Sequence, residues 1–207
     1  MIDLFLAVFI PLFIIVNPSS TLALFSAITS KYSKKERRKT AKNAAIYAAI
    51  LLIIFAFAGS GILSYLQINV YALRIAGGIL LAFVGLDMTK RGQQFGESQP
   101  GKEQKADLAL VPLAMPSLSG PGAITVTIVS MQTLDVVWSI RIILTIAAII
   151  LTMILTYIIF LGSGLVIKAL GSKGMDAFTR VMGLLTVAIA IQFALTGLGS
   201  WISTLNL

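Results

Sequence analysis

Five long stretches without a charged residue constrain the fold of this chain more than any other feature of its sequence. They run from Leu4 to Ser30, Asn43 to Leu73, Leu108 to Leu134, Ile142 to Ile167 and Val181 to Leu207. Each is longer than the ~20 apolar residues that an α-helix needs to cross about 30 Å of hydrocarbon. Because backbone polar groups inside a bilayer must be satisfied within their own segment, the stretches predict an all-α membrane protein.

A sixth span is expected around 68–88, where the chain between Arg74 and Asp87 is uncharged. The six predicted transmembrane helices lie near 2–28, 43–66, 68–89, 107–133, 139–167 and 177–205.

The basic residues predict the orientation of these helices. Every Lys and Arg except Arg74 and Arg141 falls in one of three loops, 29–42, 90–106 and 168–180. Positively charged loops stay in the cytoplasm, so both chain ends are expected outside, in a multi-pass protein of the cell membrane. This distribution also explains the net charge of +8 without a nucleic-acid partner.

The two halves of the chain resemble each other when residue n is compared with residue n + 103. The matches are Pro, Arg and Gly-Ser-Gly rather than abundant apolar types: Pro18 with Pro121, Arg38 with Arg141, 59–61 with 162–164 and, after a three-residue insertion, 74–77 with 180–183. Self-similarity at a fixed spacing indicates a duplication. Since each half holds three spans, we expect two inverted three-helix repeats, 1–90 and 107–207, joined by a polar cytoplasmic loop at 91–106. Such repeats are widespread among secondary transporters, although duplication also built channels and scaffolds.

The first span of each repeat contains a polar, helix-breaking cluster near its middle. Proline removes a backbone donor and glycine weakens a helix, so both spans should be broken close to the bilayer midplane. A break exposes amide groups at one helix end and carbonyls at the other, which suits the two charges of a small zwitterion. The alternative is a kink, with Ser and Thr bonding back to the freed carbonyls. The candidate substrate-binding residues are Asn17, Pro18, Ser19, Ser20, Thr21, Ser119, Gly120, Pro121, Gly122 and Thr125.

Four charged residues near span ends are candidates for gating or charge roles. Arg74 and Arg180 begin the third span of each half, where an arginine binds a carboxylate, pins the carbonyl end of a broken helix or snorkels to the interface. Asp87 and Asp107 lie at cytoplasmic span ends, either as proton-coupling groups or as solvated helix ends. No carboxylate falls at the midplane, so a coupling Na⁺ would need carbonyls and hydroxyls, and the choice between H⁺ and Na⁺ stays open.

Three runs of residues resemble the MarC family of membrane proteins, and the resemblance covers essentially the whole chain. They are 16–18 (Val-Asn-Pro), 74–81 (Arg-Ile-Ala-Gly-Gly-Ile-Leu-Leu) and 111–123, with its Val-Pro-Leu-Ala-Met-Pro and Gly-Pro-Gly-Ala segments. The resemblance implies a transporter of small neutral amino acids such as glycine and alanine, driven by an ion gradient and moving like an elevator.

The sequence therefore predicts a secondary transporter that binds a small zwitterionic solute and works by alternating access. A passive channel for small polar solutes and a membrane scaffold or regulatory subunit are the alternatives. An enzyme is not expected, because the chain has no Cys, no His and no paired carboxylates within its spans. No cofactor or metal is expected, and a homo-oligomer is left open.

Overall fold

The computed structural model describes residues 1–92, 109–134 and 136–205, and throughout these ranges the secondary structure is helical. The helices are α1 (Ile2–Val16), α2 (Pro18–Ile28), α3 (Lys34–Tyr65), α4 (Val70–Arg91), the π-helix η2 (Ala109–Leu118), α5 (Pro121–Thr133), α6 (Trp138–Leu161) and α7 (Ser163–Thr204). The predicted all-α class is confirmed.

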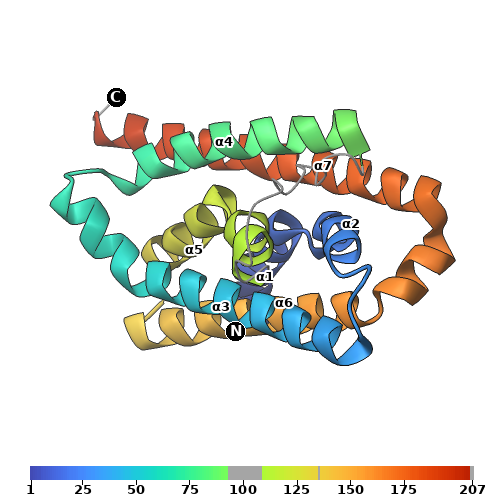
Figure 1. Cartoon of the computed structure of the whole chain (residues 1–207). Helices are drawn as coiled ribbons and strands as arrows, with labels where there is room; N and C mark the ends of the chain where they lie inside the picture. Colours follow the sequence, from blue (N-terminus) through green and yellow to red (C-terminus); the bar gives the residue numbers. More distant parts are fainter. Residues whose placement is uncertain (93–108, 135, 206–207) are drawn as a thin grey trace.

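The long helices form two pairs with the short helices between them (Figure 1). Helix α4 packs along α7 on one side, and α3 packs along α6 on the other. Helices α1, α2, η2 and α5 fill the space between the pairs, and α2 and α5 point toward opposite ends of the molecule. The broken segments are therefore enclosed by protein, which is where irregular backbone is tolerated in a bilayer.

Glycine allows α4 and α7 to approach each other closely. A Cβ atom added to Gly85 would lie 2.8 Å from the carbonyl oxygen of Gly183, and one added to Gly183 would lie 2.8 Å from that of Gly85. A Cβ on Gly78 would meet the carbonyl oxygen of Ala190 at 2.6 Å. Small residues thus set the spacing of this pair, as they do in membrane helix pairs generally.

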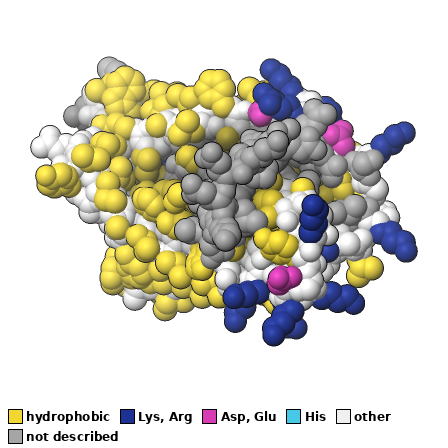
Figure 2. All heavy atoms as spheres, viewed as in Figure 1, with side chains coloured by type: hydrophobic (Ala, Val, Ile, Leu, Met, Phe, Trp, Pro, Cys, Tyr) yellow, Lys and Arg dark blue, Asp and Glu magenta, His cyan; other side chains and the backbone are white. Residues whose placement is uncertain are grey.

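Apolar side chains cover one half of the face shown in Figure 2, and Lys and Arg gather at the opposite end. Large apolar side chains such as Ile54, Phe83 and Leu184 are exposed on the long helices. Five helical segments are long and apolar enough to cross a membrane: Ile2–Ile28, Lys34–Tyr65, Val70–Arg91, Trp138–Leu161 and Lys173–Thr204. An apolar surface of this extent fits lipid rather than water.

Five of the six predicted spans correspond to long apolar helices of the described residues. The fourth, 107–133, is divided into η2 and α5, as the first is divided into α1 and α2. Its first residues, 107 and 108, lie outside the described residues, as do 93–106 of the predicted polar loop.

The predicted cytoplasmic loops 29–42 and 168–180 are largely helical. Helix α3 begins at Lys34 because Ser33 and Glu36 form a capping box, in which the Ser33 N–H donates to Glu36 Oε2 at 2.8 Å. The second loop belongs to α7, which departs from helical geometry at Gly171 with φ 62°. Charge marks which residues face water, but it does not stop a helix whose first turns project beyond the membrane.

Candidate functional site

The first predicted break is present at Asn17, between α1 and α2. Asn17 adopts a left-handed conformation, with φ 42° and ψ 70°, which Asn tolerates better than most residues. Its N–H donates to the Phe13 carbonyl at 3.0 Å and closes α1. Pro18 then begins α2, where a missing N–H costs little. The Asn-Pro pair thus ends one helix and starts the next without any intervening loop.

Polar groups at this break are buried and bonded largely to each other. The Ser19 hydroxyl donates to Asn17 Oδ1 at 2.6 Å, and the Ser20 hydroxyl donates to the Asn17 carbonyl at 3.0 Å. Asn17 is only 4% exposed, and its Nδ2 donates to the sulfur of Met88 at 3.8 Å. Because a thioether is a weak acceptor, this amide keeps donor capacity for a ligand. Thr21 is also buried beside the break.

The second break is confined to Ser119 and Gly120, between η2 and α5. Helix η2 continues to Leu118, and both the N–H and the hydroxyl of Ser119 donate to the Ala114 carbonyl, at 3.0 and 2.7 Å. This partner lies five residues back, as in a π-helix, and η2 contains two prolines. The chain becomes extended at Gly120, and Pro121 begins α5.

The kink alternative describes several of the predicted hydroxyls correctly. Ser119 bonds to Ala114 as stated above, and the Thr125 hydroxyl donates to the Pro121 carbonyl at 2.9 Å. Together with Ser20, these side chains satisfy carbonyls of their own segments. They therefore stabilise the breaks, and Asn17 and Ser19 are left as the polar side chains best placed for a ligand.

Helix α4 contacts both breaks. Its Met88 accepts the bond from Asn17, and its Gly77 lies directly against Thr125. A Cβ on Gly122 would collide with Leu81 of α4 and would lie 3.0 Å from Ile15 Cγ2 of α1. The start of α5 is thus packed against both α1 and α4, so the structure places the two breaks in one central region.

A pocket of about 140 Å³ opens beside the first break. Asn17, Pro18 and Ser19 line one part of it, and its other lining residues are apolar. The residues of the second break are not among its lining. Sequence reasoning missed the apolar wall of this pocket: Phe13, Ile159, Val166, Leu170, Met175, Phe178 and Met182.

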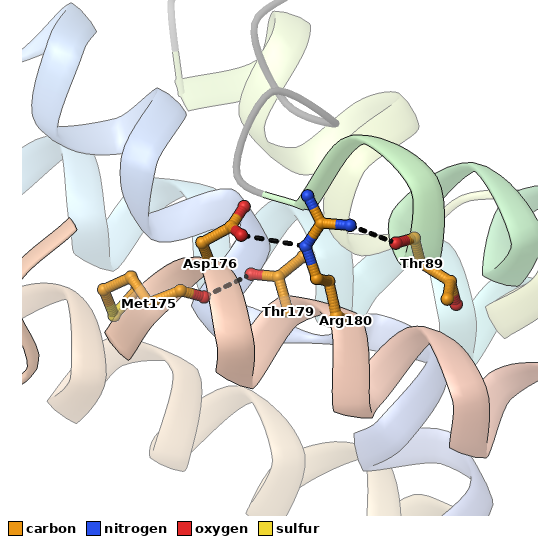
Figure 3. A network of polar contacts seen from close by, with 5 residues as sticks. All are labelled: Thr89, Met175, Asp176, Thr179 and Arg180. Atoms are coloured by element: carbon orange, nitrogen blue, oxygen red, sulfur yellow. Dashed lines mark hydrogen bonds and ion pairs between the residues drawn. The ribbon is translucent and has the colours of Figure 1, made fainter. Parts of the chain in front are cut away.

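Arg180 fastens the end of α4 to α7 rather than facing the pocket (Figure 3). Its Nε lies 2.8 Å from Asp176 Oδ2, and one of its terminal nitrogens donates to the Thr89 carbonyl at 2.9 Å. A cation at the carboxyl end of a helix binds free carbonyls and interacts favourably with the negative end of the helix dipole. Arg180 thus pins the carbonyl end of α4, whereas the prediction named the carbonyl end of a broken helix.

The other candidate charges do not gather at the pocket. Asp87 pairs with Arg91 one turn later at 2.6 Å, with both side chains substantially exposed, as expected for a solvated helix end. Arg74 is half-buried against Gly197 of α7, and within the described residues it forms no ion pair. Asp107 lies outside the described residues.

Arg37 and Ser163 make a connection that the sequence did not predict. Arg37 donates to the Ser163 hydroxyl, and its guanidinium lies 5.5 Å from the centre of the Phe25 ring. Phe25 in turn stacks on Phe160, with ring centres 4.5 Å apart. This contact joins α2, α3 and the junction of α6 with α7. The repeated Gly-Ser-Gly triplet that contains Ser163 was the available signal, although its role depends on contacts between distant segments.

Comparison with known proteins gives consistent results. Residues 2–202 match the family described as MarC family integral membrane protein. A "UPF0056 membrane protein" of Methanocaldococcus jannaschii is 39% identical over 94% of this chain and 95% of its own length. One from Archaeoglobus fulgidus is 34% identical, covering 100% of this chain and 97% of its own length.

The "UPF0056 inner membrane protein MarC" of Escherichia coli is 32% identical, covering 99% of both chains. No solved structure matches this chain. The family match and the relatives extend over nearly the whole sequence, and the five long apolar helices agree with them. The chain belongs to the MarC family of integral membrane proteins.

Proposed function

We propose that this protein is a secondary transporter of small neutral amino acids, such as glycine and alanine, that works by alternating access. One observation carries the proposal. Two helices are broken at matching positions of the two halves, and the first break opens on a small pocket through the buried residue Asn17 and its partner Ser19. Paired breaks of this kind form substrate sites in transporters built from inverted repeats.

The packing of the helices supports an inverted repeat. Helix α1 packs on α6, and η2 packs on α3; α5 contacts α3 and α4, and α2 contacts α6 and α7. In this comparison α1 corresponds to η2, α2 to α5, α3 to α6 and α4 to α7. Exchanging each helix for its counterpart converts each of these contacts into another contact of the same set. Such a pseudo-symmetric molecule has two related arrangements, one open to each side, and this is the basis of alternating access.

The pocket suits a small and neutral ligand. Its volume of about 140 Å³ is close to that of an engineered cavity of roughly 150 Å³ that accommodates benzene. Alanine has as many non-hydrogen atoms as benzene, and glycine has fewer. Since no charged side chain is among the lining residues, a ligand with net charge would be buried without a partner.

The two helix ends that meet at Asn17 suit the two charged groups of a zwitterion. The amino end of α2 begins at Pro18 and carries the positive end of its dipole, which favours a carboxylate. The carboxyl end of α1 at Val16 carries the negative end, which favours an ammonium group. Both helix ends therefore meet beside the pocket with opposite preferences.

Charge at one end of the molecule supports the proposed orientation. In Figure 2 the Lys and Arg side chains gather where α3 begins and α4 ends, which we assign to the cytoplasm. The end of α7 lies at the opposite end of the molecule from these side chains (Figure 1), so we assign it, and with six spans the N-terminus too, to the outside of the cell membrane. The name of the Escherichia coli relative places that protein in the inner membrane. An elevator-like movement coupled to H⁺ or Na⁺ completes the proposal.

Counterflow in proteoliposomes tests the proposed function. Vesicles loaded with unlabelled alanine should accumulate external radiolabelled alanine or glycine transiently and saturably. Asn17→Ala should reduce this exchange by at least about tenfold, because it removes a buried amide donor. Gly120→Leu should do the same by filling the second break.

Asn69→Ala is the matched control, since Asn69 lies at the start of α4 and its amide bonds to the Tyr71 hydroxyl at the surface. Full activity in both Asn17→Ala and Gly120→Leu would refute the site. Flux that neither saturates nor shows counterflow would indicate a channel, and folded protein without any flux would favour a scaffold.

A further inference from the structure

Helix α7 contributes a row of three residues to the apolar wall of the pocket. Met175, Phe178 and Met182 all line the pocket, and their spacing of three and four residues places them on one face of the helix. We infer that Met175 and Met182 determine specificity by limiting the side chain of the substrate to the size of a methyl group. This inference rests on the proposed function and adds to it the residues that select among neutral amino acids.

The side chain of Met175 cannot easily move aside to admit a larger substrate. Met175 is only 1% exposed and belongs to the hydrophobic core, so its side chain has packed neighbours beyond the pocket. Methionine is flexible, but displacing it into a densely packed core requires other side chains to move as well. A substrate side chain long enough to reach Met175 therefore meets an atom group with packed neighbours behind it, while Met182 is half-buried.

The backbone that carries the wall is also fastened in place. Thr179, one turn after Met175, donates to the Met175 carbonyl at 2.9 Å. Arg180 binds both Asp176 of its own helix and the carbonyl of Thr89 in α4 (Figure 3). Because these contacts hold α7 against α4, two packed helices position Met175, Phe178 and Met182.

The chemistry of the pocket excludes polar alternatives as well as large ones. Apart from Asn17 and Ser19, its lining side chains are hydrocarbon or thioether. A carboxylate or ammonium on the substrate side chain would be desolvated there without a partner, which is costly. The expected order is therefore alanine and glycine first, valine weaker and leucine weakest, with aspartate and lysine excluded.

Competition in the counterflow assay tests this inference. In wild-type protein, unlabelled glycine and alanine should displace labelled alanine, and leucine should do so only at far higher concentration. Met182→Ala and Met175→Ala should each lower the competing concentration of leucine by at least about tenfold, the discrimination that one methylene gives in a hydrophobic pocket. Met153→Ala is the matched control, because Met153 is a buried methionine of α6 outside the pocket lining.

A measurement of binding distinguishes failure of this inference from failure of the proposed function. The chain has no Cys, so V166C introduces a single thiol into the pocket wall. Alanine should slow its alkylation by a maleimide, and leucine should slow it only when Met182→Ala is also present. Active exchange with an unchanged leucine preference in both methionine variants would overturn the inference but leave the transporter proposal intact. Absence of both exchange and protection in folded protein would overturn both.

Discussion

At the scale of single residues, two glycines of α7 should respond in opposite ways to the same substitution. Gly183→Ala places a Cβ 2.8 Å from the Gly85 carbonyl oxygen and 2.8 Å from the Thr89 amide nitrogen, and backbone atoms cannot move aside locally. It should destabilise the protein by about 1–3 kcal/mol, as overpacking usually does. Gly199→Ala meets no atom within 4 Å and should stabilise by up to ~1 kcal/mol, because alanine favours helix.

Thermal unfolding of the two variants in the same detergent measures the difference. A lower melting temperature for Gly183→Ala than for Gly199→Ala is expected, and equal temperatures would show that α4 and α7 are not in close backbone contact.

Residues of the site differ in how far the sequence could predict them. The break at Asn17 was predictable, because a residue before proline avoids helical geometry and proline favours the first position of a helix. The partners of Ser119 and Thr125 were not, since a hydroxyl that bonds back to its own helix has the same sequence signature as one that faces a ligand. Met175 and Met182 carry no signal either, because in a lipid-facing protein an apolar residue marks neither the core nor a pocket.

At the scale of elements, the start of α7 is a short arm that closes one side of the pocket. It runs from Ser163 to the non-helical Gly171, and Val166 and Leu170 of the arm line the pocket. Arg37 donates a hydrogen bond to Ser163 at the beginning of the arm, and its guanidinium lies over the ring of Phe25. Loss of Arg37 should therefore let the arm move away from the pocket.

Arg37→Ala should raise the rate of V166C alkylation by roughly tenfold, since a hydrogen bond from a charged group contributes about 1.5–3 kcal/mol. Lys39→Ala removes a positive charge from the same exposed stretch of α3 and serves as the control. An equal rate in the two variants would mean that the contact of Arg37 does not hold the arm.

The helix boundaries show what a sequence can predict about elements. Ser33 and Glu36 have the spacing of a capping box, which predicts the start of α3. The charged residues that follow were nevertheless assigned to a loop. The π-helix η2 had no such signal, because two prolines in one span predict a break without specifying where it falls. Likewise, the basic residues of 168–180 predicted a loop, whereas most of this segment is helical and Arg180 binds the end of α4.

At the scale of the whole molecule, the inverted repeat makes a prediction that a parallel repeat does not share. Lys34 and Val137 are repeat mates at the offset of 103 residues, and each lies between the first and second segments of its half. Lys34 is the first residue of α3 and Val137 directly precedes α6. Both are exposed, with Val137 at 69%, so a thiol at either position should be reachable. Inversion places the two positions on opposite sides of the membrane, whereas a parallel repeat places them on the same side.

Single-cysteine variants K34C and V137C test this directly, because the chain has no other thiol to react. In intact cells a membrane-impermeant maleimide should label V137C at once and K34C only after the membrane is permeabilised, as the basic residues around Lys34 require. Labelling of both from outside would refute the inverted repeat and with it the symmetric basis for alternating access. The reverse pattern would keep the repeat but turn the molecule over, and the pocket beside Asn17 would then be approached from the other side of the membrane.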